Sequence, residues 1–390
     1  MPLRLLGLQI ANGYSPEASV FANLLAHADR TAVEPHVLHH SWAGDTASAR
    51  KFQEVSGASL QTLDFGWRSM APGQSLPAKA SARLRFLAAL PKALALARRV
   101  NPDVIYSCQQ LWDCQAATYL ARKLGKPQVI HLHYIIGSWL HPPVLARLLT
   151  CEHLVTVSNF IREEALRHGA VPEKVTTVRN SVTALPLAGP EVRREVRDEL
   201  GITPDAPLLG VVARLDPDKG QADTLQAFAL ARRTYPEARL LIIGDPTPWQ
   251  PDYAAKLMAE ASALGLGGSA LFLGHRSDVP RLLAALDVFV HPTRLDPCPL
   301  ALLEASAAGL PVIAYAEGGA NEIIQNERTG LLSAPGDVPA LAESLRRLLA
   351  DPALGRQMGA AGQARIEVEF RPEDSRRQFA EVLGAVLRAA

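Results

Sequence analysis

Short apolar, β-branched runs alternate with longer Ala-, Leu- and Arg-rich segments along the whole chain. Strands that alternate with helices in this way form parallel sheets whose faces are covered by the helices. The sequence therefore predicts an α/β fold. The expected strands lie at residues 3–10, 35–40, 103–107, 128–134, 153–158 and 175–180 in the first half, and at 208–213, 239–244, 270–274, 288–292 and 311–315 in the second.

The chain is long enough for two domains, because its 390 residues are about twice the usual size of one. A stretch rich in proline and glycine, SVTALPLAGPEV at 181–192, separates the two series of strands and is typical of a linker. We expect an amino-terminal domain over 1–183 and a carboxyl-terminal domain over 184–371. The amphipathic spacing of 372–390 predicts a last helix that packs back, either on the first domain or across the second.

The two expected domains are both Rossmann-like and face each other across a cleft. Parallel sheets bind ligands at the carboxyl ends of their strands, so this cleft is the expected ligand site. The four cysteines show neither disulfide nor zinc spacing, and no segment reaches the roughly 18 apolar residues of a membrane span. The amino-terminal run is typical of a buried strand and not of a signal peptide, so we expect a cytoplasmic protein.

Charge is distributed unevenly between the two halves. Residues 1–183 hold 19 Lys and Arg against 12 Asp and Glu, a surplus of +7, while 184–390 hold 21 against 27, or −6. The first half could meet an anionic lipid surface, a phosphorylated acceptor or an acidic glycan, or its surplus could simply be solvated. Residues 79–99 carry six cations and no acid. These residues predict a helix that Pro91 divides into two pieces. The helix either packs on the sheet with a solvated basic face or rests peripherally on the inner membrane surface.

The segment VVARLDPDKG, residues 211–220, begins as a buried strand and then presents Arg214 and Lys219 before a new helix. Two cations at the carboxyl end of a strand suit a diphosphate or the charge that develops on a leaving group, although an exposed turn with ordinary charges is the alternative. Asp216 and Asp218 form a DxD pattern that can hold a metal. Pro217 favours a helix start there instead, so no metal is expected.

The segment DPCPLALLEASAAG, residues 296–309, predicts an extended stretch followed by a helix that starts near Leu300 and ends at Gly309. The N–H groups from Leu300 and Ala301 to Leu302 are then free donors at a positive helix end, suited to an anion. Glu304 lies one turn inside, where a carboxylate is costly to bury without donors. The hydroxyl pair of a ligand could supply them, or Glu304 could cap or pair locally. Asp296 could reach other hydroxyls of the same ligand.

Taken together, residues 207–332 resemble the carboxyl-terminal domain of the family 4 retaining glycosyltransferases, which have the GT-B fold. The resemblance rests on Arg214 with Lys219, the GD of LIIGD, and HPTRLDPCPLALLEASAAGLPVIAYAEGGANEII. It implies that Arg214 and Lys219 bind the donor diphosphate, that Glu304 binds the ribose hydroxyls, and that Asp296 contacts the donor sugar. Asp296 stands where the family has Glu, which shortens its reach by one methylene and alters the sugar contact.

The first half resembles the same family more weakly. QVIHLHY corresponds to the strand that ends in a histidine near the transferred sugar; His133 fits best, then His131, and a satisfied core histidine is the alternative. Gly13 in NGYSPEAS corresponds to the glycine-rich loop near the donor phosphates and acceptor. Trp112, Tyr134 and Trp139 could line an acceptor groove by stacking on sugar rings, with core packing expected for at least one of them.

The sequence thus predicts a retaining glycosyltransferase that moves a sugar from a UDP- or GDP-sugar to a hydroxyl of a saccharide, lipid-linked or small-molecule acceptor, in polysaccharide or glycolipid biosynthesis. The predicted catalytic residues are His133, Arg214, Lys219 and Asp296, and the predicted donor-binding residues are Gly13, Arg214, Lys219, Leu300, Ala301 and Glu304. No cofactor, metal or nucleic acid is expected. A sugar-nucleotide epimerase or hydrolase and a noncatalytic nucleotide-sugar-binding module are the alternatives. No GxGxxG follows a strand, which argues against a dinucleotide dehydrogenase.

Overall fold

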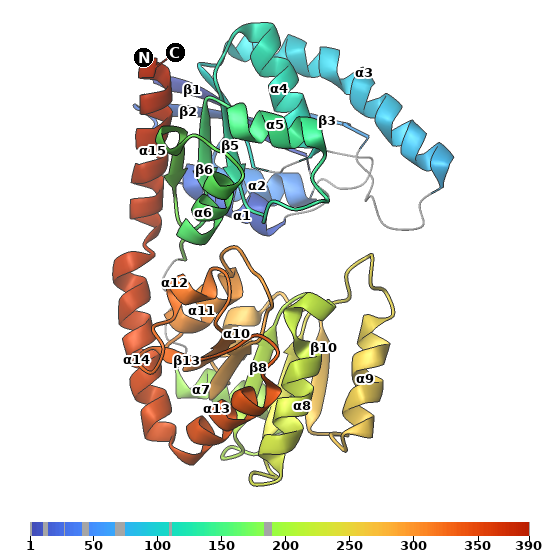
Figure 1. The fold of residues 1–390 in the computed structure, drawn as a ribbon, viewed down its shortest axis with the longest axis vertical. Helices are drawn as coiled ribbons and strands as arrows, with labels where there is room; N and C mark the ends of the chain where they lie inside the picture. The colour runs from blue at the N-terminus through green and yellow to red at the C-terminus, as the bar shows by residue number, and fades with distance from the viewer. Residues whose placement is uncertain are drawn as a thin grey trace. The chain divides into compact units, whose positions relative to one another are not determined.

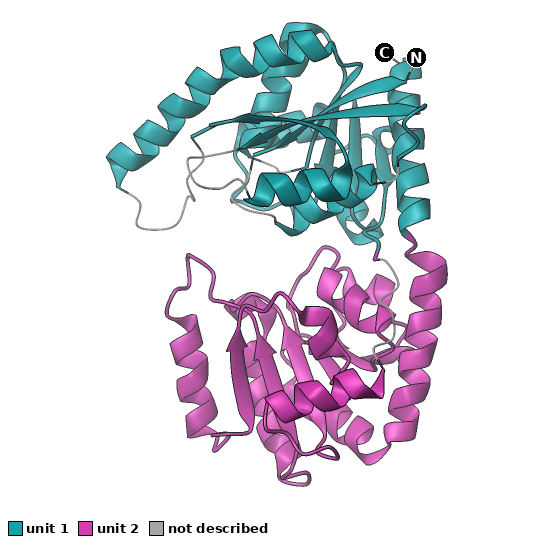
Figure 2. Cartoon of the chain, turned by 180° about the vertical axis from the view of Figure 1, so that it is seen from behind, with its two compact units in different colours: residues 1–181, 372–390 teal, residues 182–371 magenta. Residues whose placement is uncertain are grey.

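The computed structural model describes residues 2–10, 15–26, 28–40, 47–66, 75–108, 111–182 and 189–389. The chain divides into two compact units, one made of residues 1–181 with 372–390 and the other of 182–371 (Figure 2). The boundary expected from the sequence follows residue 183. Each unit contains one parallel sheet with helices packed against it (Figure 1), which confirms the predicted α/β fold class.

The sheet of the first unit has seven strands in the order β3-β2-β1-β4-β5-β6-β7. The edge strand β3 was not predicted, because its exposed SLQTL sequence has no apolar alternation. The strands are β1 (Leu3–Gln9), β2 (Val33–His40), β3 (Ser59–Leu63), β4 (Val104–Ser107), β5 (Gln128–Leu132), β6 (His153–Thr156) and β7 (Val175–Thr177).

The sheet of the second unit has six strands in the order β10-β9-β8-β11-β12-β13. Strand order reverses between β8 and β11, and at such a switch point the connections leave a crevice at the carboxyl ends of the strands. Strand β13, at one edge of this sheet, is only four residues long and, like β3 of the first unit, was not predicted. The strands are β8 (Leu208–Val212), β9 (Arg239–Ile243), β10 (Ala270–Gly274), β11 (Val288–His291), β12 (Val312–Tyr315) and β13 (Gly330–Ser333).

Both faces of the second sheet are buried. Leu209 and Val211 of β8 point into a core shared with the helices of one face, while a Cβ at Gly210 would touch Leu286 on the opposite face. The helices of this unit are α7 (Pro190–Glu199), the 3-10 turn η2 (Pro217–Lys219), α8 (Gln221–Arg232), α9 (Tyr253–Ala263), α10 (Val279–Leu283), α11 (Leu300–Ala307), α12 (Ala320–Ile323), α13 (Val338–Ala350) and α14 (Pro352–Glu369).

One helix of the first unit differs from its prediction. Helix α3 (Leu76–Val100) runs without a break through Pro91, so the expected division of this segment is wrong. Pro91 lacks the N–H that would bond the Leu87 carbonyl four residues earlier, yet helical backbone continues on both sides of it. The other helices are α1 (Pro16–Leu25), α2 (Ala47–Ser56), α4 (Trp112–Leu124), α5 (Pro142–Thr150), α6 (Asn159–Arg167), the turn η1 (Pro172–Lys174) and α15 (Pro372–Ala389).

The last helix, α15, is part of the first unit. Its Phe379 ring packs edge-on against Tyr106 of β4 at 5.2 Å, and the Ser375 hydroxyl donates to the Arg179 carbonyl at 2.9 Å. Most of the expected linker lies outside the described residues, and α7 begins at Pro190. Over the part of the chain that the structure describes, no helix has the length and apolar character needed to cross a membrane.

Candidate active site

The turn after β8 carries the two cations expected to bind a diphosphate. Asp216 caps η2 by accepting a hydrogen bond from the Asp218 N–H at 3.2 Å, and Gly220 closes the turn with a φ of 68°. A Cβ at residue 220 would lie 2.1 Å from the carbonyl oxygen of Pro292. Only glycine tolerates both this φ and this approach, so the turn after β8 packs directly on the loop after β11.

Lys219 and Asp296 meet across this contact between neighbouring strands. The Lys219 Nζ donates to Asp296 Oδ2 at 2.7 Å, and the two side chains are only 19% and 17% exposed. Burial by itself would raise the pKa of Asp296, but the nearby Lys219 and His291 outweigh it, and the pKa lies below its ordinary value. Asp296 is therefore an ionised carboxylate held beside a cation at the switch point of the sheet.

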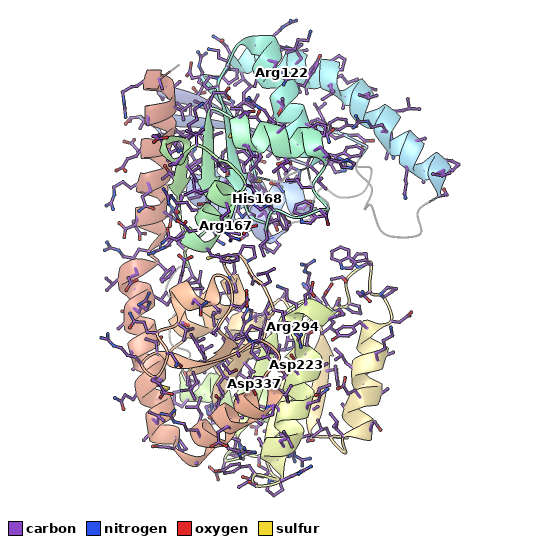
Figure 3. The ribbon with its side chains drawn as sticks, viewed as in Figure 1. Arg122, Arg167, His168, Asp223, Arg294 and Asp337 are labelled. Atoms are coloured by element: carbon purple, nitrogen blue, oxygen red, sulfur yellow. The ribbon has the colours of Figure 1, made fainter. Side chains whose placement is uncertain are left out.

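Arg294 fastens the Asp296 loop to the first turn of α8. Its backbone N–H donates to the Asp218 carbonyl at 2.8 Å, and its guanidinium donates to Asp223 Oδ2 at 2.8 Å (Figure 3). The hydroxyl of Tyr315 donates to the same carboxylate oxygen at 2.8 Å. These contacts hold the segment that carries Asp296 against the segment that carries Lys219.

Arg214 lies just beyond β8, with its exposed guanidinium 5.4 Å from the centre of the Trp249 indole. The Trp249 Nε1 donates to Asp216 Oδ2 at 2.8 Å, so one indole contacts both the Arg214 side chain and the cap of the Lys219 turn. Trp249 was not singled out from the sequence. Its place a few residues after the GD that follows β9 was the available signal.

Glu304 lies in the second turn of α11, and no described residue donates a hydrogen bond to its carboxylate or forms an ion pair with it. Burial raises the pKa of Glu304. At the start of the same helix, the Leu302 and Leu303 N–H groups bond to the Pro299 carbonyl, so Leu302 is not a free donor as expected. The N–H groups of Leu300 and Ala301 have no acceptor among the described residues and stay available for an anion.

His291 was not singled out from the sequence, although it ends β11 beside the Lys219–Asp296 pair. Burial lowers its pKa to about 4, even though the carboxylate of Asp296 opposes this shift. Its Nε2 is buried and has no hydrogen-bond partner among the described residues, and the same is true of Thr293 Oγ1. Two polar atoms at this strand end therefore lack partners within the described protein.

In the first unit, His133 directly follows β5 at the carboxyl edge of the sheet. Burial lowers its pKa to about 4, opposed by the charge of Glu17, and its Nε2 has no partner among the described residues. Its ring centroid is 4.2 Å from that of His131. Glu17, in the first turn of α1, accepts a hydrogen bond from the Tyr134 hydroxyl. Glu17 was overlooked in NGYSPEAS, where only Gly13 was considered; Gly13 lies outside the described residues.

The three aromatic residues proposed for an acceptor groove have different environments. Trp112 packs edge-on against Phe86 at 4.6 Å, as expected of a residue that serves the core. Tyr134 and Trp139 contact each other at 6.0 Å between ring centroids, and Trp139 is 48% exposed. Of these three residues, Tyr134 directly follows His133 and contacts Trp139, so these two present an aromatic face there.

The predicted site residues of the second unit thus gather at one edge of its sheet. Arg214 and Lys219 follow β8, Asp296 follows β11, and Glu304 lies on the helix that continues from Asp296. His133 belongs to the first unit and occupies the corresponding edge there. Across the described ranges, no group of three or more His, Cys, Asp or Glu side chains is arranged to hold a metal.

Two sequence profiles of known families match the chain. "Glycosyltransferase Family 4" matches residues 18–184, and "Glycosyl transferases group 1" matches residues 192–365. The alpha-maltose-1-phosphate synthase of Mycolicibacterium smegmatis is 30% identical over 290 residues, which cover 66% of this chain and 73% of that protein.

A second relative and a solved structure extend the comparison. The GDP-mannose-dependent monoacylated alpha-(1-6)-phosphatidylinositol monomannoside mannosyltransferase of Corynebacterium glutamicum is 35% identical over 192 residues, 47% of this chain and 48% of that protein. The crystal structure of Anabaena Alr3699/HepE in complex with UDP and glucose superposes with a TM-score of 0.83 at 22% identity, covering 98% of this chain and all of that one. The shared architecture is the GT-B fold.

Proposed function

The chain belongs to glycosyltransferase family 4 and is a nucleotide-sugar-dependent glycosyltransferase, and we propose that its donor binds at the carboxyl ends of β8 and β11 in the second unit. The observation that carries this proposal is the contact of Lys219 Nζ with Asp296 Oδ2 at 2.7 Å, which joins the ends of the two strands at the switch point. Ligands of open parallel sheets bind at this position.

The diphosphate of the donor lies against Arg214, Lys219 and the start of α11 in this proposal. Arg214 offers a planar fork, Lys219 a compact charge, and Leu300 and Ala301 two free N–H groups at a positive helix end. These donors stabilise the negative charge that grows on the departing nucleoside diphosphate. Because two side-chain cations perform this task, we propose that transfer needs no metal ion, so that activity persists in a chelator.

Glu304 and Asp296 bind hydroxyl groups of the donor. The Glu304 carboxylate lacks a donor among the described residues, and the vicinal hydroxyls of a ribose supply two. Asp296 is ionised beside Lys219, so it can accept a hydrogen bond from a hydroxyl of the transferred sugar. The bond from the sugar to the diphosphate breaks as the bond to the acceptor hydroxyl forms, and the sugar is transferred with retention of configuration, as in the family.

The first unit binds the acceptor in this proposal, with His133 as the residue nearest the reacting hydroxyl. Its buried Nε2 has no partner within the described ranges, and its lowered pKa indicates a neutral ring that can accept or donate one hydrogen bond. Gly13, which follows the first strand in the sequence, is proposed from sequence alone as a donor-binding residue. Relatives act on saccharide and lipid acceptors, and both classes carry the hydroxyl that the reaction needs.

A panel of UDP- and GDP-sugars, scored by release of the nucleoside diphosphate with and without a chelator, tests this function. Arg214→Ala, Lys219→Ala and Asp296→Asn should each lower kcat/KM for the active donor more than tenfold, because each removes a charge next to the diphosphate or the sugar. Arg233→Ala, an exposed cation at the far end of α8, is the matched control. Wild-type kinetics in both Arg214→Ala and Lys219→Ala would overturn the assignment of the site.

We further propose that α3 brings the protein into peripheral contact with an anionic membrane. Residues 79–99 of this helix carry six cations and no acid. Leu84 and Leu87 on the same helix are 67% and 47% exposed, which is unusual for large apolar side chains. Exposed leucines beside cations are typical of helices that lie on lipid surfaces.

A further inference from the structure

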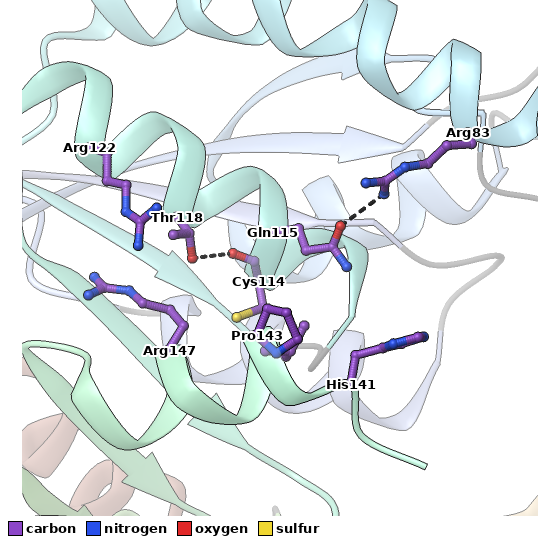
Figure 4. Close-up of a pocket in the computed structure, with 9 residues that line it drawn as sticks. Arg83, Cys114, Gln115, Thr118, Arg122, His141, Pro143 and Arg147 are labelled. Carbon is purple, nitrogen blue, oxygen red and sulfur yellow. Dashed lines mark hydrogen bonds between the residues drawn. The ribbon is translucent and has the colours of Figure 1, made fainter.

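A cavity of about 490 Å³ lies in the first unit between helices α3, α4 and α5 (Figure 4). One face of α4, with Gln115, Thr118 and Arg122 at helical spacing, forms one wall. His141 and Arg147 contribute from the start and the middle of α5, and Arg83 contributes from α3. None of its lining residues is acidic, and its volume falls in the range of small-molecule sites.

The cations of this cavity differ in how far they are already neutralised. Arg147 is occupied, because it binds Glu152 at 2.6 Å and Gln128 at 2.8 Å. Among the described residues, Arg83 donates only to the neutral Gln115, at 3.0 Å, and it packs over the Phe86 ring at 5.6 Å. Arg122 is exposed and forms no ion pair with any described residue. Arg83 and Arg122 therefore offer positive charge that no carboxylate cancels.

Different residues line the two ends of the cavity. Figure 4 shows Arg83 and His141 toward one end and Arg122 with Arg147 toward the other. Gln115, which binds Arg83, is seven residues before Arg122 on α4, so the two ends are about 10 Å apart. The Arg83 end adjoins the apolar surface of α3, because Leu87 follows Arg83 by four residues and shares its helix face.

We propose that this cavity binds the head group of an anionic phospholipid. The phosphate of such a lipid lies next to its acyl chains, and this order matches Arg83 and His141 beside the exposed leucines of α3. The part of the head group beyond the phosphate then extends along α4 toward Thr118 and Arg122. This site rests on the membrane contact proposed above and is separate from the donor site in the second unit.

Co-sedimentation with vesicles tests the proposal, using the full chain with phosphatidylcholine vesicles that contain or lack phosphatidylglycerol. We expect binding only with phosphatidylglycerol, and we expect Arg83→Glu and Arg122→Glu each to weaken it at least tenfold. Arg83→Lys and Arg122→Lys should keep most of the affinity. Lys174→Glu reverses a charge at an exposed residue of η1, outside the cavity and outside α3, and it should weaken binding less than threefold.

Two results would overturn the proposal. If Lys174→Glu weakens binding as much as Arg83→Glu, diffuse attraction to the surface explains it and the cavity holds no head group. If millimolar inorganic phosphate or glycerol 1-phosphate displaces the protein from vesicles completely, the site recognises a free phosphate. Nucleoside diphosphate binding, measured by calorimetry on the same variants, should stay unchanged, so that a failure here is distinct from a failure of the donor site.

Discussion

The guanidinium of Arg214 lies 5.4 Å from the centre of the Trp249 indole, and the same indole donates its N–H to Asp216 at 2.8 Å. Trp249 thus connects the side chain of one donor-site cation with the cap of the turn that holds the other, Lys219. Neither contact involves the ligand directly. Trp249 is therefore a positioning residue for both cations.

Removal of this indole should weaken the donor site without unfolding the unit. A cation–π contact at a partly exposed site contributes about 0.5–1 kcal/mol and a hydrogen bond about 1 kcal/mol. Trp249→Ala should therefore raise the Kd for the nucleoside diphosphate about tenfold, and Trp249→Phe, which keeps the ring, about threefold. Calorimetry measures both. Met258→Ala, with similar exposure on α9, is the control; equal affinities in all three variants would contradict the role of Trp249.

Glu304→Gln should separate stability from binding. The Glu304 carboxylate is desolvated without a donor, and the neutral amide avoids that cost, so the free energy of unfolding at pH 7 should stay the same or rise by about 1 kcal/mol. Because the pKa of Glu304 is raised in the folded state, this gain should vanish as the pH falls below the ordinary carboxyl pKa of about 4.3. The Kd for the nucleoside diphosphate should rise more than tenfold. Urea unfolding and calorimetry test the two effects, and a large loss of stability would show that Glu304 has a structural partner.

His291 should make the second unit less stable in mild acid. Its pKa falls from 6.5 to about 4 on folding, so the unfolded chain binds a proton below pH 6.5 that the folded protein excludes. The free energy of unfolding should therefore decrease from pH 6.5 toward pH 4, by about 2 kcal/mol at pH 5. Urea unfolding of the wild type and His291→Leu at pH 7 and pH 5 measures this; the variant should show the smaller decrease. Parallel pH dependence in both proteins would exclude the effect.

Two glycines with nearly the same backbone angles should respond differently to alanine. Gly220 and Gly265 have φ values of 68° and 70°, but only at Gly220 would a Cβ meet another atom, the Pro292 carbonyl oxygen at 2.1 Å. Gly265→Ala should cost about 1 kcal/mol, and Gly220→Ala about 3 kcal/mol. Thermal unfolding compares them. Gly220→Ala should also weaken donor binding, because it moves the turn that carries Lys219; equal melting temperatures would contradict the close contact.

The inner strands and the edge strands β7 and β10 were predictable from sequence, whereas the edge strands β3 and β13 were missed. The inner strands of both sheets are recognisable as apolar runs, such as LLGVV of β8. Strand β3 instead pairs through its backbone and leaves polar side chains in water. The continuous path of α3 through Pro91 was also unpredictable, because proline lacks a backbone N–H and usually breaks or kinks a helix. Ala89 and Ala93, on either side of Pro91, are buried in the same hydrophobic core, and this packing is a property of the folded unit.

The candidate site shows the same limit. Arg214, Lys219, Asp296 and Glu304 were predictable because each lies at a strand end or in the early turns of a helix, positions that the sequence marks directly. Trp249 and His291 were missed, since their importance comes from contacts with residues far away in the chain. The pairing of Trp249 with Arg214 joins the ends of β8 and β9 and requires the strand order to be known.

The first unit cannot be completed early in synthesis. The ring of Phe379 fills the space beside Tyr106, and α15 follows the whole of the second unit in the chain. On the ribosome, the second unit therefore emerges while the first still exposes the apolar surface that α15 will cover. The part of the protein translated first should reach its native state last, and chaperones that bind exposed apolar segments should engage residues 1–181 in that interval.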